Sequence, residues 1–204
     1  MSGHVQLASD PREFFRDRVS TSARRLGVSI DEHVEFYLVN LLYEFVNPDK
    51  INIAVGDVDV LETPLALMLK QAVESPLPQR IRIMKALGDT SLYFAGFFQD
   101  YFTRKTFDIS YYITLGSSAY ENVSTLVRDS GRDEQMTGTF VELSNNFVKL
   151  VDIVAEVSAV PGQNKPTDIL AVYDRWTRSN SDRLRRILED NGITPIEVRT
   201  RLAQ

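Results

Sequence analysis

The chain of 204 residues contains no cysteine and only two histidines. The missing cysteine excludes a disulfide scaffold, a thiolate zinc site, an iron–sulfur cluster and a cysteine nucleophile. His4 lies near the start of the chain, and His33 lies beside Asp31 and Glu32 in the first turn of an expected helix, where a solvated side chain is usual. No Glu-x-x-His pattern occurs, which excludes the di-iron sites of helical bundles. We therefore predict no metal ion, no cofactor and no catalytic residue.

Phosphate-binding glycine loops are also missing. Neither G-x-x-x-x-G-K-[ST] nor G-x-G-x-x-G occurs, and no G-x-S-x-G precedes a helix. The nearest approach, Gly116-Ser117-Ser118, falls inside a helical pattern. We interpret Gly116 as the point where two helices cross closely.

Long apolar runs and excess positive charge are missing as well. The apolar stretches are interrupted by Asn40, Glu44, Gly96 or Gln99, too early to span a bilayer. The formal net charge of −5 gives no general attraction to nucleic acids or anionic membranes. The first 15 residues lack the charged start and apolar run of a secretory signal. The sequence thus favours a cytoplasmic protein with no nucleic-acid partner and no membrane insertion.

Helical periodicity dominates what is present. Apolar residues recur at spacings of three and four, with short connectors and no strand–helix alternation. This predicts an all-α fold: a flexible tail over 1–8 and a single-domain bundle of about seven or eight helices over 9–204. The expected helices cover 10–26, 29–47, 64–74, 79–103, 109–127, 137–159, 167–190 and a short segment from 194.

Local signals set several boundaries. Asp10-Pro11 predicts a helix start and Gly27 a helix end. Two capping boxes, Ser29 to Glu32 and Thr194 to Glu197, predict further starts. Around Gly56-Asp57, two short alternating runs indicate a small β-hairpin near 51–61, with an ordered loop as the alternative.

Polar and aromatic residues concentrate in 79–127, within two otherwise apolar helices. The residues that stand out are Arg82, Asp89 and Tyr93 on the first helix and Tyr112, Tyr120 and Glu121 on the second. One interpretation is a pocket between the 79–103 and 109–127 helices that binds a small molecule. The other is helix packing, in which Asp89 pairs with Arg82, a tyrosine hydroxyl or a backbone amide, since buried polar groups need partners. Both stay open.

Two segments carry a resemblance. LGDTSLYFAGFF (87–98) and ISYYITLGSSAY (109–120) resemble paired motifs of an uncharacterised family of bacterial all-helical proteins with no assigned function. The resemblance covers about a third of the chain. It implies a bacterial origin and an all-helical fold, and it implies no catalytic residue, cofactor or substrate.

Two hypotheses of function follow. The first is a non-catalytic regulatory or adaptor module that acts through helix faces, with a protein partner or with itself as a homodimer. It rests on the missing catalytic patterns and on an excess of apolar helix surface, including the repeat of Phe140, Phe147 and Val154. The second is a small-molecule-binding protein or enzyme that uses the Asp/Tyr pocket.

Overall fold

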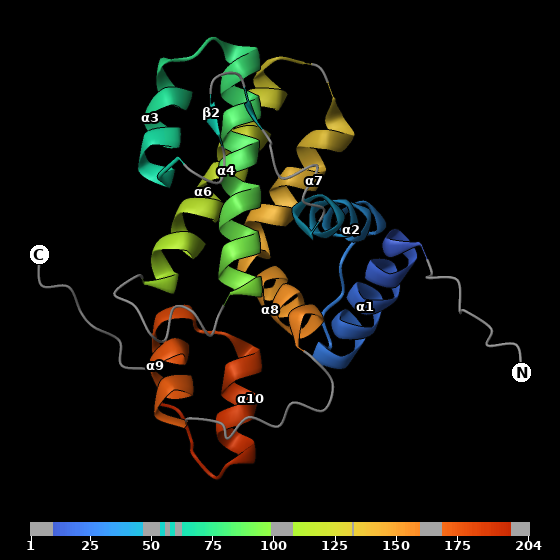
Figure 1. Cartoon of the computed structure of the whole chain (residues 1–204), viewed down its shortest axis with the longest axis vertical. Helices are drawn as coiled ribbons and strands as arrows, with labels where there is room; N and C mark the ends of the chain where they lie inside the picture. The colour runs from blue at the N-terminus through green and yellow to red at the C-terminus, as the bar shows by residue number, and fades with distance from the viewer. Residues whose placement is uncertain are drawn as a thin grey trace, which may run out of the picture.

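The computed structural model describes residues 10–46, 54–55, 58–59, 63–98, 108–131, 133–159 and 169–196. Within these ranges it confirms the all-α class, with nine helices instead of the expected seven or eight. The helices are α1 (Pro11–Leu26), α2 (Glu32–Val46), α3 (Leu65–Glu74), α4 (Leu77–Phe97), α6 (Ile109–Asp129), α7 (Glu134–Asn145), α8 (Phe147–Ser158), α9 (Ile169–Ser179) and α10 (Asp182–Asp190). Figure 1 shows α4 running through the middle of the bundle. No helix in these ranges is long and apolar enough to cross a membrane.

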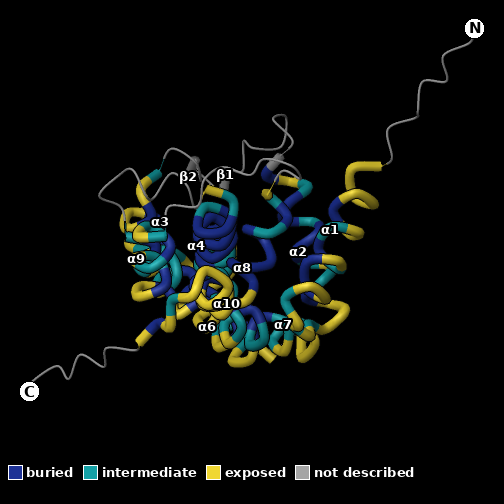
Figure 2. The backbone as a smooth tube through the Cα atoms, turned by 90° about the horizontal axis from the view of Figure 1, so that it is seen from below, coloured by how far each residue is buried: buried dark blue, intermediate teal, exposed yellow. Residues whose placement is uncertain are grey.

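Helix α4 is central because it is apolar around most of its circumference. Ile83, Leu87, Leu92 and Ala95 are each fully buried, although their spacing puts them on different sides of the helix. α6 and α8 pack along α4, and α3 lies beside it. In Figure 2, α4 is almost continuously buried while the exposed residues lie on the outer helices.

Two glycines let the central helices approach closely. A Cβ at Gly96 of α4 would come 2.5 Å from the Val154 side chain on α8. A Cβ at Gly116 of α6 would overlap the Phe147 ring and come 2.7 Å from the Cβ of Ser91 on α4. The close crossing predicted at Gly116 is therefore confirmed.

Helix ends follow the local signals with one exception. Asp10 accepts a hydrogen bond from the Arg12 amide, and Gly27 ends α1 with a left-handed φ of 66°, both as predicted. The capping box at Ser29 is wrong, because the Asp31 carboxylate accepts the His33 amide at 2.9 Å and caps α2 instead. The second box extends to Glu197, outside the described residues.

The helix count differs because two expected helices are each broken in two, while the short helix expected from 194 falls mostly outside the described residues. The 137–159 segment breaks at Asn146, whose side chain donates to the Glu142 carbonyl and competes with the helical ladder. The 167–190 segment breaks at Asn180, which has a φ of 52°. Ser181 then caps α10 by accepting the Leu184 amide. Asn tolerates a left-handed backbone and Ser favours caps, so Asn180-Ser181 is a break signal in the sequence.

The expected hairpin is described only in part. Strands β1 (Ala54–Val55) and β2 (Val58–Asp59) pair antiparallel, with Val55 opposite Val58. The rest of 51–61, the tail over 1–8 and the end of the 79–103 helix beyond 98 lie outside the described residues.

Helices α9 and α10 form a hairpin at one end of the bundle (Figure 1). Its four buried apolar residues, Val172, Trp176, Leu184 and Leu188, make a cluster separate from the main core.

Polar contacts with α8 join this hairpin to the bundle. Buried Asp152 on α8 accepts the Ser181 hydroxyl at 2.7 Å. Glu156, one turn further along α8, forms ion pairs with Arg183 of α10 at 3.2 Å and Arg25 of α1 at 2.6 Å. These polar contacts tie the N-terminus of α10 to the main body.

Candidate functional site

Asp89 is the centre of a buried polar network on α4. Asp89 is only 7% exposed, and its carboxylate has three hydrogen-bond partners, one from each of three helices. Tyr37 of α2 and Tyr120 of α6 both donate their hydroxyls to Oδ1, the latter at 2.8 Å. Lys85, one turn before Asp89 on α4, places its Nζ 2.6 Å from Oδ2. The network therefore joins α2, α4 and α6 through one carboxylate.

The environment of this network favours the protonated forms of Tyr37, Tyr120 and Lys85. Burial, together with the negative charge of Asp89, raises the pKa of both Tyr37 and Tyr120 well above the ordinary value of a tyrosine. Burial favours the neutral form of Lys85, but the charge and hydrogen bond of Asp89 outweigh it, so the pKa of Lys85 is raised. Both hydroxyls and the ammonium thus keep their protons near neutral pH and serve as donors.

The structure gathers only part of the predicted site. Asp89 and Tyr120 are in direct contact, as one interpretation required. Arg82 and Glu121 are exposed and are not among the hydrogen-bond partners of Asp89 in the described part of the chain, so Lys85 takes the place that Arg82 was expected to fill. Residues four apart share a helix face one turn apart, whereas seven residues span about 10 Å of axis.

The remaining two predicted residues belong to an aromatic cluster. Tyr93 is buried and stacks between Phe45 of α2, with ring centroids 4.5 Å apart, and Phe97, 5.0 Å away. Tyr112 stacks on Phe94 at 6.3 Å. These rings pack around the C-terminal half of α4, so they serve packing more than a polar site.

Tyr37 and Lys85 are the members that sequence reasoning missed. The Lys85-to-Asp89 spacing of four was a usable signal for a helical ion pair. Tyr37 carried no such signal, because it falls on the apolar stripe of its helix and its partner is 52 residues away.

A groove of about 550 Å³ opens beside this network, between α2 and α7. The α2 wall comprises His33, Phe36, Tyr37, Asn40, Leu41 and Glu44, a stripe with helical spacing. The α7 wall comprises Asp133, Gln135, Met136, Thr139 and Phe140, and Lys85 of α4 completes the lining.

The groove has an apolar floor and a polar rim. Leu41 and Phe140 are buried, and the Tyr37 ring meets the Phe140 ring edge-on at 5.6 Å. Phe36 stands at the rim with 61% of its surface exposed. At one end, the Gln135 amide lies 3.1 Å from the His33 ring and links the two walls. Tyr37 thus has its hydroxyl in the buried network and its ring in the groove.

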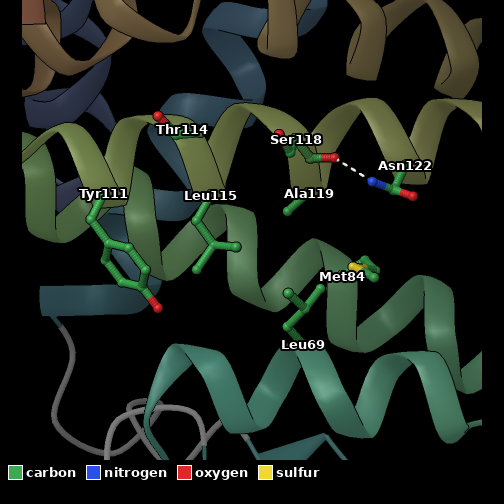
Figure 3. Close-up of a pocket in the computed structure, with 8 residues that line it drawn as sticks. All are labelled: Leu69, Met84, Tyr111, Thr114, Leu115, Ser118, Ala119 and Asn122. Atoms are coloured by element: carbon green, nitrogen blue, oxygen red, sulfur yellow. Dashed lines mark hydrogen bonds between the residues drawn. The ribbon is translucent and has the colours of Figure 1, made fainter. Parts of the chain in front are cut away.

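A second, smaller pocket of about 360 Å³ lies between α3, α4 and α6 (Figure 3). Leu69, Met84 and Leu115 supply apolar walls, and Tyr111 extends from α6 toward α3. Asn122 donates to the Ser118 carbonyl at 2.7 Å on the α6 side. The six residues predicted for the pocket do not line it.

The Asp89 network has few groups available to react with a bound molecule. Both Asp89 oxygens accept hydrogen bonds, and the Lys85 ammonium is paired with the same carboxylate. A nucleophile or general base needs a free lone pair facing a reactant. The network therefore stabilises the junction of three helices and holds Tyr37 and Lys85 in fixed positions at the groove.

Comparison of the chain with protein-family models, with curated proteins and with solved structures gives no match in any of the three.

Proposed function

We propose that this protein is a non-catalytic regulatory or adaptor module that binds a helical segment of a partner protein in the groove between α2 and α7. The observation that carries the proposal is the groove itself: an open space of about 550 Å³ between two helix walls, with an apolar floor and a polar rim. Amphipathic helices bind in grooves of this kind through apolar residues on one face.

The exposed aromatic residue at the rim supports this proposal. Phe36 keeps 61% of its surface exposed on a helix whose other large apolar side chains are mostly buried. Aromatic residues are enriched among those that dominate binding energy in protein interfaces, because they bury a large area at low entropic cost. Phe36 is placed to cover a helix lying in the groove.

The Asp89 network supports the non-catalytic half of the proposal. Its donors and acceptors are used within the protein, between Asp89, Tyr37, Tyr120 and Lys85. A substrate would have to displace one of these contacts, and each lost contact to a buried charge is costly. The network is thus better suited to fixing the groove wall than to turning over a substrate.

Site-specific photo-crosslinking tests the proposal. A photoreactive phenylalanine analogue at position 36 should crosslink a partner protein in cells of the source organism. The same analogue at Val73 is the matched control, because Val73 is 60% exposed on α3. Crosslinks of one protein from position 36 but not 73, abolished by Gln135→Trp in the groove, are the expected result. Equal products from both positions would contradict it.

A second function, small-molecule binding, is favoured by the pocket between α3, α4 and α6. Its volume of about 360 Å³ lies within the range of small-ligand sites, and its walls are apolar with polar groups along α6. An apolar molecule with one polar end fits that lining.

Ligand-induced thermal stabilisation tests this second function. A library of apolar acids and heteroaromatic compounds is screened for a raised melting temperature. Leu69→Trp should fill the pocket and abolish any such shift, whereas Leu67→Trp, on the exposed side of α3, should preserve it. A shift that survives Leu69→Trp would place the ligand elsewhere.

A further inference from the structure

The two helices that form the groove carry only one sign of charge. Between Glu32 and Val46, α2 contains Glu32, Glu35 and Glu44, and between Glu134 and Asn145, α7 contains Glu134 and Glu142. Neither contains a lysine or an arginine, although the whole chain has 23 of them, about one residue in nine. The capping residues Asp31 and Asp133 add two more carboxylates at the N-terminal ends.

Lys85 offsets this charge only in part, because its ammonium pairs with Asp89 and also interacts electrostatically with Glu44. It is the single lysine or arginine among the groove-lining residues, and its Nζ lies 2.6 Å from the Asp89 carboxylate. The positive charge of Lys85 is therefore compensated mainly by the buried Asp89 carboxylate. Arg12 of α1 lies 4.7 Å over the Tyr43 ring, and Tyr43 does not line the groove.

Two acidic groups line the groove directly. Glu44 is exposed, and no described residue forms an ion pair with it; Asp133 is exposed and accepts the Met136 amide as a helix cap. They belong to different walls. A bound helix would thus meet a carboxylate on each side and apolar surface between them.

We infer that the partner segment is a basic amphipathic helix, with lysine or arginine flanking a stripe of apolar anchors. This inference rests on the proposed function and adds the chemistry of the partner. Complementary charge speeds association and excludes wrong partners, while the apolar anchors supply most of the affinity.

The same charges disfavour a second copy of this chain as the occupant. A symmetric dimer through this groove would place α2 and α7 against their own equivalents. The Glu44 and Asp133 carboxylates of both copies would then line the interface, and Lys85, the cation among the described lining residues, is already paired with Asp89. Like charges across an interface cost binding energy, so the homodimer expected from the sequence is not what this surface favours.

Selection from a displayed library of helical peptides tests the inference. The library fixes a helical scaffold and randomises exposed positions, and the intact protein is the target. Enriched peptides should carry net positive charge and an apolar stripe, and should lose binding to Phe36→Ser. Their affinity should also fall as salt concentration rises.

Charge reversal sharpens the test. Glu44→Lys should weaken the enriched peptides about tenfold at low salt, which corresponds to about 1.4 kcal/mol. Glu121→Lys introduces the same charge change at an exposed α6 position that does not line the groove, and it should alter affinity less than about twofold. Both variants change exposed residues, and thermal melts of each variant should show an unchanged fold.

The outcomes separate the two proposals. Enriched peptides that are neutral or acidic but still require Phe36 would overturn the basic partner and leave the groove as a binding site. Enriched peptides indifferent to Phe36→Ser, or none enriched at all, would overturn both. Loss of self-association in Phe36→Ser by sedimentation would replace the partner with a second copy of the chain.

Discussion

The ring of Tyr120 lies directly against the backbone of Gly88. A Cβ at position 88 would come 2.5 Å from Cε1 of that ring, so no side chain fits there. From this position the Tyr120 hydroxyl reaches Oδ1 of the next residue, Asp89, at 2.8 Å. Gly88 and Asp89 therefore both stabilise this helix crossing. The glycine leaves space for the Tyr120 ring, and the aspartate accepts a hydrogen bond from the Tyr120 hydroxyl.

Replacing Asp89 should destabilise the fold. Asp89→Asn removes the charge that pairs with Lys85 and leaves fewer acceptor sites for the two hydroxyls. We expect a loss of roughly 1–3 kcal/mol in the free energy of unfolding, measured by urea denaturation. A double-mutant cycle with Tyr120→Phe should show coupling, because the two residues share one hydrogen bond. Independent, additive losses would mean that the bond contributes nothing.

The close crossing at Gly116 should tolerate no methyl group. Gly116→Ala would press on the Phe147 ring and Ser91, and we expect a loss of about 1–3 kcal/mol in stability. Gly138→Ala is the matched control, since that glycine lies in α7 with nothing within 4 Å of its added Cβ. It should raise stability by up to about 1 kcal/mol through helix propensity. Equal effects at the two sites would refute the crossing.

Alkaline titration should distinguish Tyr37 and Tyr120 from tyrosines that ionise in the folded protein. The raised pKa values of Tyr37 and Tyr120 mean that the native state holds their protons to higher pH than the unfolded chain does. Stability should therefore fall as the pH rises through about 10, the unfolded value. Ultraviolet absorbance of tyrosinate should show at least two of the eight tyrosines ionising only as the protein unfolds. Smooth ionisation of all eight in the folded state would contradict this.

Asp152 should make stability fall as pH rises toward neutrality. Burial raises the pKa of Asp152 to about 6, against the lowering effects of the Ser181 hydroxyl and Arg183. Because the native state binds this proton more tightly than the unfolded state, ionisation between pH 4 and 6 costs stability. A shift of about two pKa units corresponds to roughly 3 kcal/mol as an upper bound.

Asp152→Asn isolates that contribution from those of other carboxylates. The variant cannot ionise at this site, so its stability relative to the wild type should improve by about 1–3 kcal/mol from pH 4 to pH 7. Urea unfolding of both proteins at several pH values measures the difference. A difference that stays constant with pH would show that Asp152 does not titrate in this range.

The sequence predicted the helices well because their signals are local. Asp10, Pro11 and Gly27 act within one turn, and the burial of Phe140, Phe147 and Val154 follows their heptad spacing. The broken helices were missed because a single asparagine, Asn146 or Asn180, lowers helix propensity only slightly within a continuing apolar pattern.

The site was harder to predict because its contacts are distant in sequence. Asp89 was identified as a buried charge that needs partners, and one tyrosine partner, Tyr120, was among the predicted residues. Tyr37 joins from a helix 52 residues earlier, and the groove depends on the packing of α7 against α2. The spacing of residues within one helix cannot predict which surfaces of two distant helices, such as α2 and α7, pack together.

The separate apolar cluster of α9 and α10 suits this hairpin to local unfolding. Val172, Trp176, Leu184 and Leu188 form a small apolar cluster outside the main core. Units of this kind unfold locally at a lower free energy than the whole protein. Amide protons of α9 and α10 should therefore exchange with deuterium through an opening that leaves α4 protected. Proteases should release the same hairpin before they cut the remaining helices.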